Sequence, residues 1–311
     1  MLNLASGLKI TPTNPQGNKQ SLSTKDKSMA YKQNLNVTFK KYLPFEQDGK
    51  TYNLYDLPKG FVIEGSLNLS CKDLLELPDL SDVVIKGNFY CYGNKLTSLK
   101  GAPKEVGKSF DCSNNGLTSL IGAPKVVGGY FECSRNQLTS LEGAPQNVGE
   151  DFKCDYNGLT SLKGAPQKVG GSFICYNNKL TSLDGAPKEV GRNFCCQYNQ
   201  LTSLEGAPIV VDGGFDCYHN QLTSLVGVSR LKESEKIYCD DSLGAKYGFS
   251  NAENYGIKYE KLCNSPLYKS EAAMSRVRSK QQQEQKAKQQ EKINAEFSQW
   301  LKDNSNKPTR E

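Results

Sequence analysis

Apolar side chains recur along the middle of the chain with a fixed step of 21 residues. Each copy has a Phe, a Cys, an Asn and two Leu, and five of the seven also have a Val-Gly pair, in the consensus F-x-C-x-x-N-x-L-T-S-L-x-G-A-P-x-x-V-G-x-x. Self-similarity at a short fixed period is typical of a stacked repeat array. The chain therefore predicts a repeat solenoid, whose seven regular copies begin at Phe89, Phe110, Phe131, Phe152, Phe173, Phe194 and Phe215.

Within one copy, the Phe and Cys positions predict a short β-strand, because residues two apart in a strand point to the same face. The Asn follows where the chain leaves the strand, and its amide can bind backbone groups at that turn or form a ladder with its equivalents. Gly-Ala-Pro and Val-Gly predict a compact return without a regular helix. One copy cannot bury its own apolar side chains, so copies stacked about 4.8 Å apart have to share a continuous core.

Atypical copies stand at both ends of the array. Residues 67–77 form a degenerate copy, and Leu54 to Pro58 resembles half of another. At the other end, Gly-Ala-Pro decays to Gly227-Val228-Ser229 and the period stops. Terminal copies must face water, so such divergence is expected of a stacked array. We place the solenoid at residues 44–229, with about eight repeats and a partial cap.

The flanking segments differ in composition from the repeats. Residues 1–43 are rich in Lys, Ser, Thr, Asn and Gln, which predicts a disordered or loosely attached basic segment. Residues 230–268 mix aromatic and polar side chains and predict a C-terminal cap. Residues 269–311 are Gln/Lys-rich, and either a polar helix or a disordered tail fits them. One amphipathic patch there, able to dock on the solenoid or on a partner, consists of Ile293, Phe297, Trp300 and Leu301.

The run V-x-x-x-F-x-C-x-x-N-x-L-T-S-L resembles the leucine-rich repeat, with Phe and Cys in two of the family's Leu positions. The short period and the segments Leu54–Pro58 and Leu74–Pro78 are similar to the short bacterial subclass found in secreted effectors. The Gly-Ala-Pro variant is similar to repeats of bacteriophage and bacterial proteins. Over about residues 50–230, the resemblance implies a leucine-rich-repeat horseshoe with a parallel β-sheet on its concave face, a mostly non-helical convex side and a C-terminal helix. It also implies that the concave face binds a partner, usually a protein.

Charge is concentrated at the two ends of the chain. Of the net charge of +6, residues 1–43 carry seven Lys and one Asp, and residues 269–311 carry ten Lys or Arg and six acidic residues. The part between them is therefore acidic, with a net charge of −4. This distribution does not favour nucleic-acid binding by the whole protein. It predicts at most weak electrostatic contact of the basic tails with acidic surfaces.

The sequence also bears on the location of the protein. It has no apolar run of the roughly 18 residues that a spanning helix needs, and its N-terminus lacks the apolar stretch of a secretory signal. We expect no membrane span and a cytoplasmic, reducing compartment. Secretion into a host cell by a non-classical bacterial route stays open, because such a route uses an unstructured, acid-poor N-terminus.

The 11 cysteines raise the question of disulfides and metals. Seven of them occupy the inward repeat column, where Cys behaves as a small apolar residue. Parallel side chains in such a ladder do not suit the dihedral angle of a disulfide. The chain has no C-x-x-C pair and His219 is its only histidine, so we expect no metal and no cofactor. We therefore predict reduced core thiols, except that Cys195 should face outward on the concave side.

Catalytic residues are not indicated. Cys239 and Asp241 match the C-x-D letters of bacterial leucine-rich effectors that ligate ubiquitin, but only about 70 residues follow them. A conventional hydrolase arrangement would need His219, which occupies a variable position of the repeat. We predict that Cys239 is a cap residue.

The variable outward positions carry the remaining information. Tyrosines gather at these positions in the later copies, and exposed aromatics with polar neighbours are typical of protein-binding hot spots. Alternatively, the tyrosines only stack between copies and stabilise the sheet. The predicted partner-binding residues are Arg135, Lys153, Tyr156, Ile174, Tyr176, Tyr198, Tyr218 and His219.

Three functions remain to be weighed. The first is a non-catalytic protein–protein interaction module that binds its partner on the concave face. The second is a secreted bacterial effector with a small activity at Cys239. The third is a phage or bacterial structural or assembly protein, tethered by its basic ends to an acidic surface or to nucleic acid.

Overall fold

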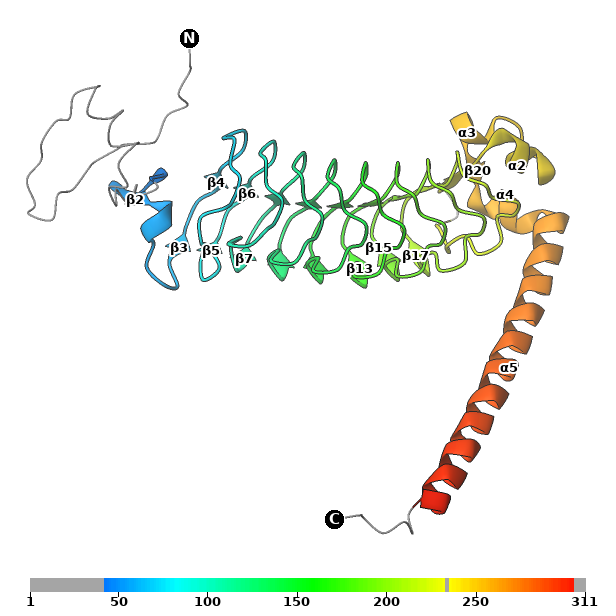
Figure 1. The fold of residues 1–311 in the computed structure, drawn as a ribbon. Helices are drawn as coiled ribbons and strands as arrows, with labels where there is room; N and C mark the ends of the chain where they lie inside the picture. The colour runs from blue at the N-terminus through cyan, green and yellow to red at the C-terminus, as the bar shows by residue number, and fades with distance from the viewer. Residues whose placement is uncertain (1–41, 233–234, 305–311) are drawn as a thin grey trace, which may run out of the picture.

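The computed structural model describes residues 42–232 and 235–304. It is a parallel β-solenoid that continues into a long C-terminal helix (Figure 1). The predicted fold class is confirmed: strands stack in parallel along the repeat region, and that region contains little helix. The predicted basic segment 1–43 lies almost wholly outside the described residues.

The Phe-x-Cys segments form the first sheet, as predicted. Each contributes a two-residue strand, and successive strands pair in parallel with Phe opposite Phe. A strand of the C-terminal cap, β19, continues the stack, and β20 closes it in antiparallel orientation. In spatial order the strands are β4 (Leu67–Asn68), β6 (Phe89–Tyr90), β8 (Phe110–Asp111), β10 (Phe131–Glu132), β12 (Phe152–Lys153), β14 (Phe173–Ile174), β16 (Phe194–Cys195), β18 (Phe215–Asp216), β19 (Lys236–Tyr238) and β20 (Ile257–Lys258).

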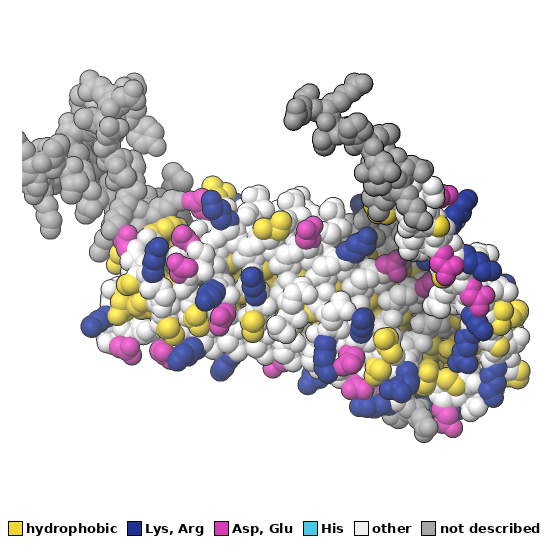
Figure 2. All heavy atoms as spheres, turned by 90° about the horizontal axis from the view of Figure 1, so that it is seen from below, with side chains coloured by type: hydrophobic (Ala, Val, Ile, Leu, Met, Phe, Trp, Pro, Cys, Tyr) yellow, Lys and Arg dark blue, Asp and Glu magenta, His cyan; other side chains and the backbone are white. Residues whose placement is uncertain are grey.

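A second parallel sheet, not predicted from the sequence, runs along the other side of the solenoid (Figure 1). Its strands end at the Val of a Val-Gly pair or at the equivalent Ile63, Ile85 and Val211, so the return segment is itself a strand. Seen from below, this side of the molecule carries interspersed basic and acidic side chains (Figure 2). The strands are β3 (Val62–Ile63), β5 (Val84–Ile85), β7 (Glu105–Val106), β9 (Val126–Val127), β11 (Asn147–Val148), β13 (Lys168–Val169), β15 (Glu189–Val190) and β17 (Val210–Val211).

The core consists of columns of identical side chains inside the coil. The seven Phe rings from Phe89 to Phe215 are fully buried, with centroids of neighbouring rings 5.2 to 5.8 Å apart. Beside them runs the Cys column, in which the Cys133 thiol donates to the Lys153 carbonyl oxygen at 3.3 Å. All eleven cysteines are free thiols, as predicted, and burial raises the pKa of Cys133 well above its usual range.

The Asn column joins each turn to the turn before it. Asn136 Nδ2 donates to the carbonyl oxygens of Cys112 at 3.1 Å and Cys133 at 3.0 Å, and its Oδ1 accepts from the Leu117 backbone N–H at 3.0 Å. The same pattern recurs in the later copies. One side chain thus binds backbone groups of two turns, which is the ladder that the sequence predicts.

A glycine column sets how closely the turns approach. A Cβ on Gly149 would overlap the carbonyl oxygen of Gly128, which belongs to the preceding turn. The backbone of one turn therefore occupies the space that a side chain of the next would need. The same clash recurs at Gly107, Gly128, Gly170 and Gly191.

The N-terminal end is closed by a hairpin of β1 (Pro44–Gln47) and β2 (Lys50–Asn53), followed by the 3-10 helix η1 (Leu54–Asp56). Gln47 binds the edge of β3 with its side-chain amide. Its Nε2 donates to the Val62 carbonyl oxygen at 3.1 Å, and its Oε1 accepts from the Glu64 backbone N–H at 2.9 Å. These bonds satisfy backbone groups that an open sheet edge would expose.

The C-terminal cap consists of β19, β20 and the short helices α2 (Asp241–Lys246), α3 (Ala252–Tyr255) and α4 (Tyr259–Asn264). Helix α5 (Pro266–Asn304) follows, so residues 269–304 are helical rather than a disordered tail. Glu271 fixes its first turns: the carboxylate accepts from the Tyr247 hydroxyl at 2.6 Å and pairs with Lys246 at 2.7 Å.

The rest of α5 projects away from the solenoid (Figure 1). Ile293 and Phe297 are exposed, so this part of the predicted apolar patch does not dock on the solenoid; the side chains of Trp300 and Leu301 lie outside the described part. Within residues 42–232 and 235–304, no helix has the length and apolar character to cross a membrane.

Asn136→Ala should destabilise the solenoid strongly. It removes an amide that pairs with backbone groups of two turns, and each buried group left unpaired costs about 1 to 3 kcal/mol. We expect the urea midpoint of unfolding to fall markedly. Gln137→Ala, at the exposed neighbouring position, is the control and should leave the midpoint unchanged. Equal midpoints for the two variants would contradict the ladder.

Gly149→Ala tests the close approach of the turns. The added methyl group meets backbone that cannot rotate away, so we expect a loss of about 3 kcal/mol in the free energy of unfolding. Gly116→Ala is the matched control, because its Cβ would lie 3.5 Å from the nearest atom, an ordinary contact. A melting temperature of Gly149→Ala at or above that of Gly116→Ala would show that the turns are not in tight contact.

Candidate functional site

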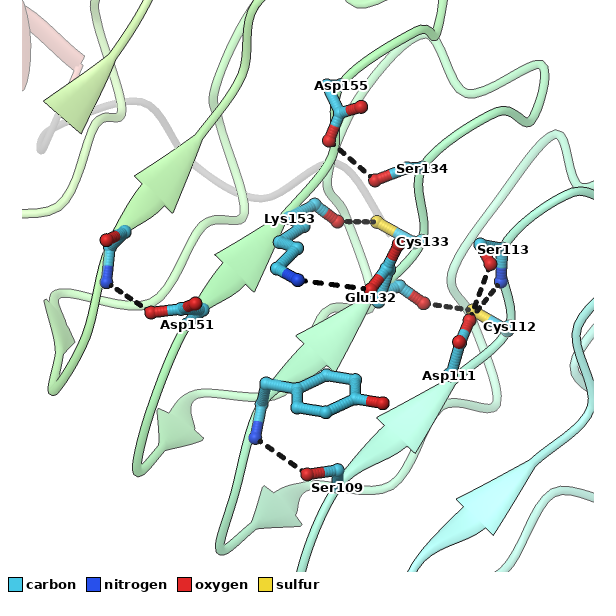
Figure 3. A network of polar contacts seen from close by, with 12 residues as sticks. Ser109, Asp111, Cys112, Ser113, Glu132, Cys133, Ser134, Asp151, Lys153 and Asp155 are labelled. Atoms are coloured by element: carbon cyan, nitrogen blue, oxygen red, sulfur yellow. Dashed lines mark hydrogen bonds and ion pairs between the residues drawn. The ribbon is translucent and has the colours of Figure 1, made fainter. Parts of the chain in front are cut away.

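The outward-pointing side chains of the β4–β20 sheet form the outer face, which is the surface on which the sequence predicts partner binding. The residues immediately before each Phe, which form one column of this face, are engaged in hydrogen bonds between turns. Ser109 Oγ accepts from the backbone N–H of Tyr130 at 3.3 Å, and Asp151 Oδ1 accepts from that of Ser172 at 2.7 Å (Figure 3). Asn193 Oδ1 likewise accepts from Gly214 at 2.8 Å. This column therefore stabilises the stack.

The middle of the outer face carries a partly buried polar network (Figure 3). Lys153 Nζ lies 3.4 Å from Glu132 Oε2 and 5.2 Å from the centroid of the Tyr130 ring. Burial and the nearby Asp111 carboxylate raise the pKa of Glu132, whereas Lys153 opposes this shift. Lys153, a predicted partner-binding residue, is thus engaged within the sheet.

Arg135, Tyr156 and Tyr176, three of the predicted partner-binding residues, lie together on neighbouring turns. The Arg135 guanidinium carbon lies 4.4 Å from the centroid of the Tyr156 ring, and the Tyr156 and Tyr176 rings meet edge to face at 5.4 Å. Tyr156 is 41% exposed. Burial and the Asp155 carboxylate raise the pKa of Tyr176 to about 12, so its hydroxyl stays protonated and able to donate.

Tyr198, Tyr218 and His219 form a second group two turns further on. The Tyr198 ring meets Tyr218 edge to face at 5.5 Å and lies 4.5 Å from the His219 ring. His219 Nε2 is 3.2 Å from a carboxylate oxygen of Glu253 in helix α3. We call the two groups together the tyrosine patch: Arg135, Tyr156, Tyr176, Tyr198, Tyr218 and His219. Ile174 is half-buried on β14, in register with Lys153 and Cys195, and is not part of either ring cluster.

The backbone conformation singles out three residues of the patch. The second residue after each Cys has a positive φ of 50° to 64°, in the left-handed region. Gly, Asn or His, which adopt this region more readily than other residues, occupy the position in four of the seven regular copies, whereas other bulky side chains there are unusual. The three copies that depart from this preference have Arg135 (φ 56°), Tyr156 (φ 50°) and Tyr198 (φ 55°).

An open hollow of about 560 Å³, which we call the end hollow, lies where the outer face meets the cap. Of its residues, only Tyr218 was predicted as part of a site. Asp216 occupies an outward position of the last regular copy, whereas Tyr238 could have been found only by extending that column into β19, and Glu253 lies outside the repeat period. The charged and aromatic side chains that line it are Asp216, Tyr218, Glu235, Lys236, Tyr238 and Glu253.

Cys239 and Cys195 differ in their surroundings. Cys239 is fully buried and follows Cys217 in the Cys column, since β19 extends the sheet. Burial and the neighbouring Asp240 and Asp241 raise its pKa to about 12, which disfavours the thiolate that a nucleophile needs. This supports the interpretation as a cap residue. Cys195 points outward as expected, but its thiol is partly covered and lies 3.4 Å from Asp216 Oδ2.

Comparison with known proteins adds no relative, because neither a family model nor a curated protein matches the sequence. Functional inference therefore rests on the geometry of the outer face.

Asp216→Asn should stabilise the fold at neutral pH. Burial raises the pKa of Asp216, so its charged form is disfavoured in the folded state, and protonation as the pH falls through that pKa stabilises the fold. An amide avoids this penalty, and we expect a gain of about 0.5 to 1 kcal/mol at pH 7. The gain should shrink at acidic pH. It can be measured by thermal unfolding between pH 4 and 8, with Asp184→Asn, at an exposed position, as the control. A variant less stable than the parent at pH 7 would contradict this assignment.

Proposed function

We propose that this protein is a non-catalytic interaction module that binds a protein partner on the tyrosine patch. The observation that supports this most directly is the presence of large side chains at left-handed positions. Such a conformation costs a non-glycine residue about 1 to 2 kcal/mol. At equivalent positions the chain uses Asn114 and Asn177 instead. Residues retained against a local cost are typical of functional surfaces.

The chemistry of the patch suits a protein or peptide ligand. Tyrosine offers a large contact area with few rotatable bonds, together with a hydroxyl group for hydrogen bonding, and so loses little entropy on binding. The two ring clusters are held by edge-to-face contacts and lie on a stacked scaffold. A surface arranged before the partner arrives avoids part of the ordering cost of association. Stacking between turns and partner binding are therefore compatible roles for the same rings.

The repeat residues also bear on the class of repeat and on the compartment. We propose that the array belongs to the leucine-rich repeats of the short bacterial or phage type. Its buried Leu columns, such as Leu138 and Leu141, and its Asn ladder support this. Eleven free cysteines, nine of them buried or nearly so in one column or beside it, support a reducing compartment such as the cytoplasm.

The alternatives gain less support. An effector activity at Cys239 would require exposure of a thiol that is fully buried. An assembly role would depend mainly on the basic tails, and residues 1–41 and 305–311 lie outside the described part of the chain.

The proposal can be tested with a displayed library of random 12-residue peptides, selected on the immobilised protein. In the double variant Tyr156→Asn/Tyr198→Asn, each tyrosine takes the residue that the chain itself has at equivalent positions. We expect selected peptides to bind this variant at least about tenfold more weakly, as loss of hot-spot residues implies. Its melting temperature should equal or exceed that of the parent, because Asn relieves the left-handed strain.

Ile121→Ala/Ile209→Ala is the matched control, because both side chains are about two-thirds exposed and lie outside the outer face (66% and 65%). It should bind the selected peptides like the parent. Unchanged affinity of the tyrosine double variant for every selected peptide would refute the proposal.

A further inference from the structure

The end hollow differs chemically from the rest of the outer face. Asp216 enters it from β18, Glu235 and Lys236 from the start of β19, and Glu253 from helix α3. Three carboxylates therefore face one ammonium group, which leaves the hollow negative. His219 stands at its margin, with Nε2 3.2 Å from Glu253 and Nδ1 3.8 Å from Asp240.

Two aromatic rings complete the walls of the end hollow. The side chains of Tyr218 and Tyr238 line the same space as the carboxylates. A cation next to both kinds of group gains from Coulomb attraction and from the ring quadrupole. Among the described residues, no group of three or more potential ligands converges as a metal site would require. The arrangement therefore suits a large organic cation better than a metal ion.

We propose that the end hollow binds a basic side chain, arginine or lysine, of the protein partner. This inference rests on the proposed function and specifies its chemistry. Tyr218 belongs to both the tyrosine patch and the hollow, so a partner lying along the patch can reach the hollow with one side chain. The guanidinium group, with its planar shape and five donors, stacks on aromatic rings and pairs with carboxylates at once.

The test uses the full chain, labelled with ¹⁵N for NMR, and the peptide acetyl-Gly-Gly-Arg-Gly-Gly-amide. The matched probe replaces arginine by citrulline, which has nearly the same shape and no charge, and a third peptide carries lysine. We expect the arginine peptide to shift the signals of residues lining the hollow, and citrulline to bind at least about tenfold more weakly. The lysine peptide shows whether the guanidinium or only the charge is recognised.

Two variants should change the affinity in opposite directions. Glu253→Gln removes one carboxylate and should weaken arginine binding several-fold, whereas Lys236→Gln removes the competing cation and should strengthen it about twofold. Thermal unfolding of both variants distinguishes loss of binding from loss of fold. Three results would overturn the proposal. They are equal binding of the arginine and citrulline peptides, signal shifts confined to other regions of the protein, and no shifts at a peptide concentration of about 20 mM.

The two proposals fail separately. Tyr156→Asn/Tyr198→Asn should still bind the arginine peptide, because neither residue lines the hollow. If library peptides depend on the patch while arginine does not enter the hollow, only this inference falls. If arginine enters the hollow but no selected peptide depends on the patch, the proposed function falls and the cation site remains.

Discussion

Each turn of this solenoid depends on its neighbour for hydrogen bonds that it cannot make alone. The Asn136 amide, for example, binds carbonyl oxygens of its own turn and of the preceding one, and the Cys133 thiol donates to the following turn. The strands are only two residues long, so these side-chain bonds supply much of what a longer strand would supply through its backbone. Stability therefore resides in the contacts between turns, as in other repeat proteins.

The same dependence decides which outward residues are available to a partner. The column before each Phe is engaged in binding the next turn, and Lys153 is paired with Glu132 inside the face. The column two residues after the Cys is mostly exposed, and there the chain varies among Gly, Asn, Arg, Tyr and His. The tyrosine patch and the end hollow share Tyr218 and form one continuous surface toward the C-terminal cap.

Much of the fold follows from the sequence, because the 21-residue period fixes the inward columns and the Asn ladder. The second sheet could not be predicted from the sequence. Its segment before the Gly has one inward side chain, which is too little alternation of apolar and polar residues to indicate a strand. The tyrosines that the sequence groups lie in two ring clusters, and the sequence could not show that Lys153 is paired or that Tyr156 has a left-handed backbone. Glu253 lines the end hollow because helix α3 packs on β19. This packing could not be predicted from the sequence, because α3 lies outside the repeats.

The glycine column has a consequence for how such a protein can change over evolutionary time. Because the backbones of successive turns touch at Gly128 and Gly149, an insertion of a few residues within a turn would break the contact. Whole turns, however, are interchangeable, so the chain can lengthen or shorten by duplication or deletion of 21-residue units. A duplication or deletion between them would move the cluster of Arg135, Tyr156 and Tyr176 relative to the end hollow by about 4.8 Å per turn, the spacing of strands. The number of repeats between two contact points thus sets the distance between them, in steps of one turn.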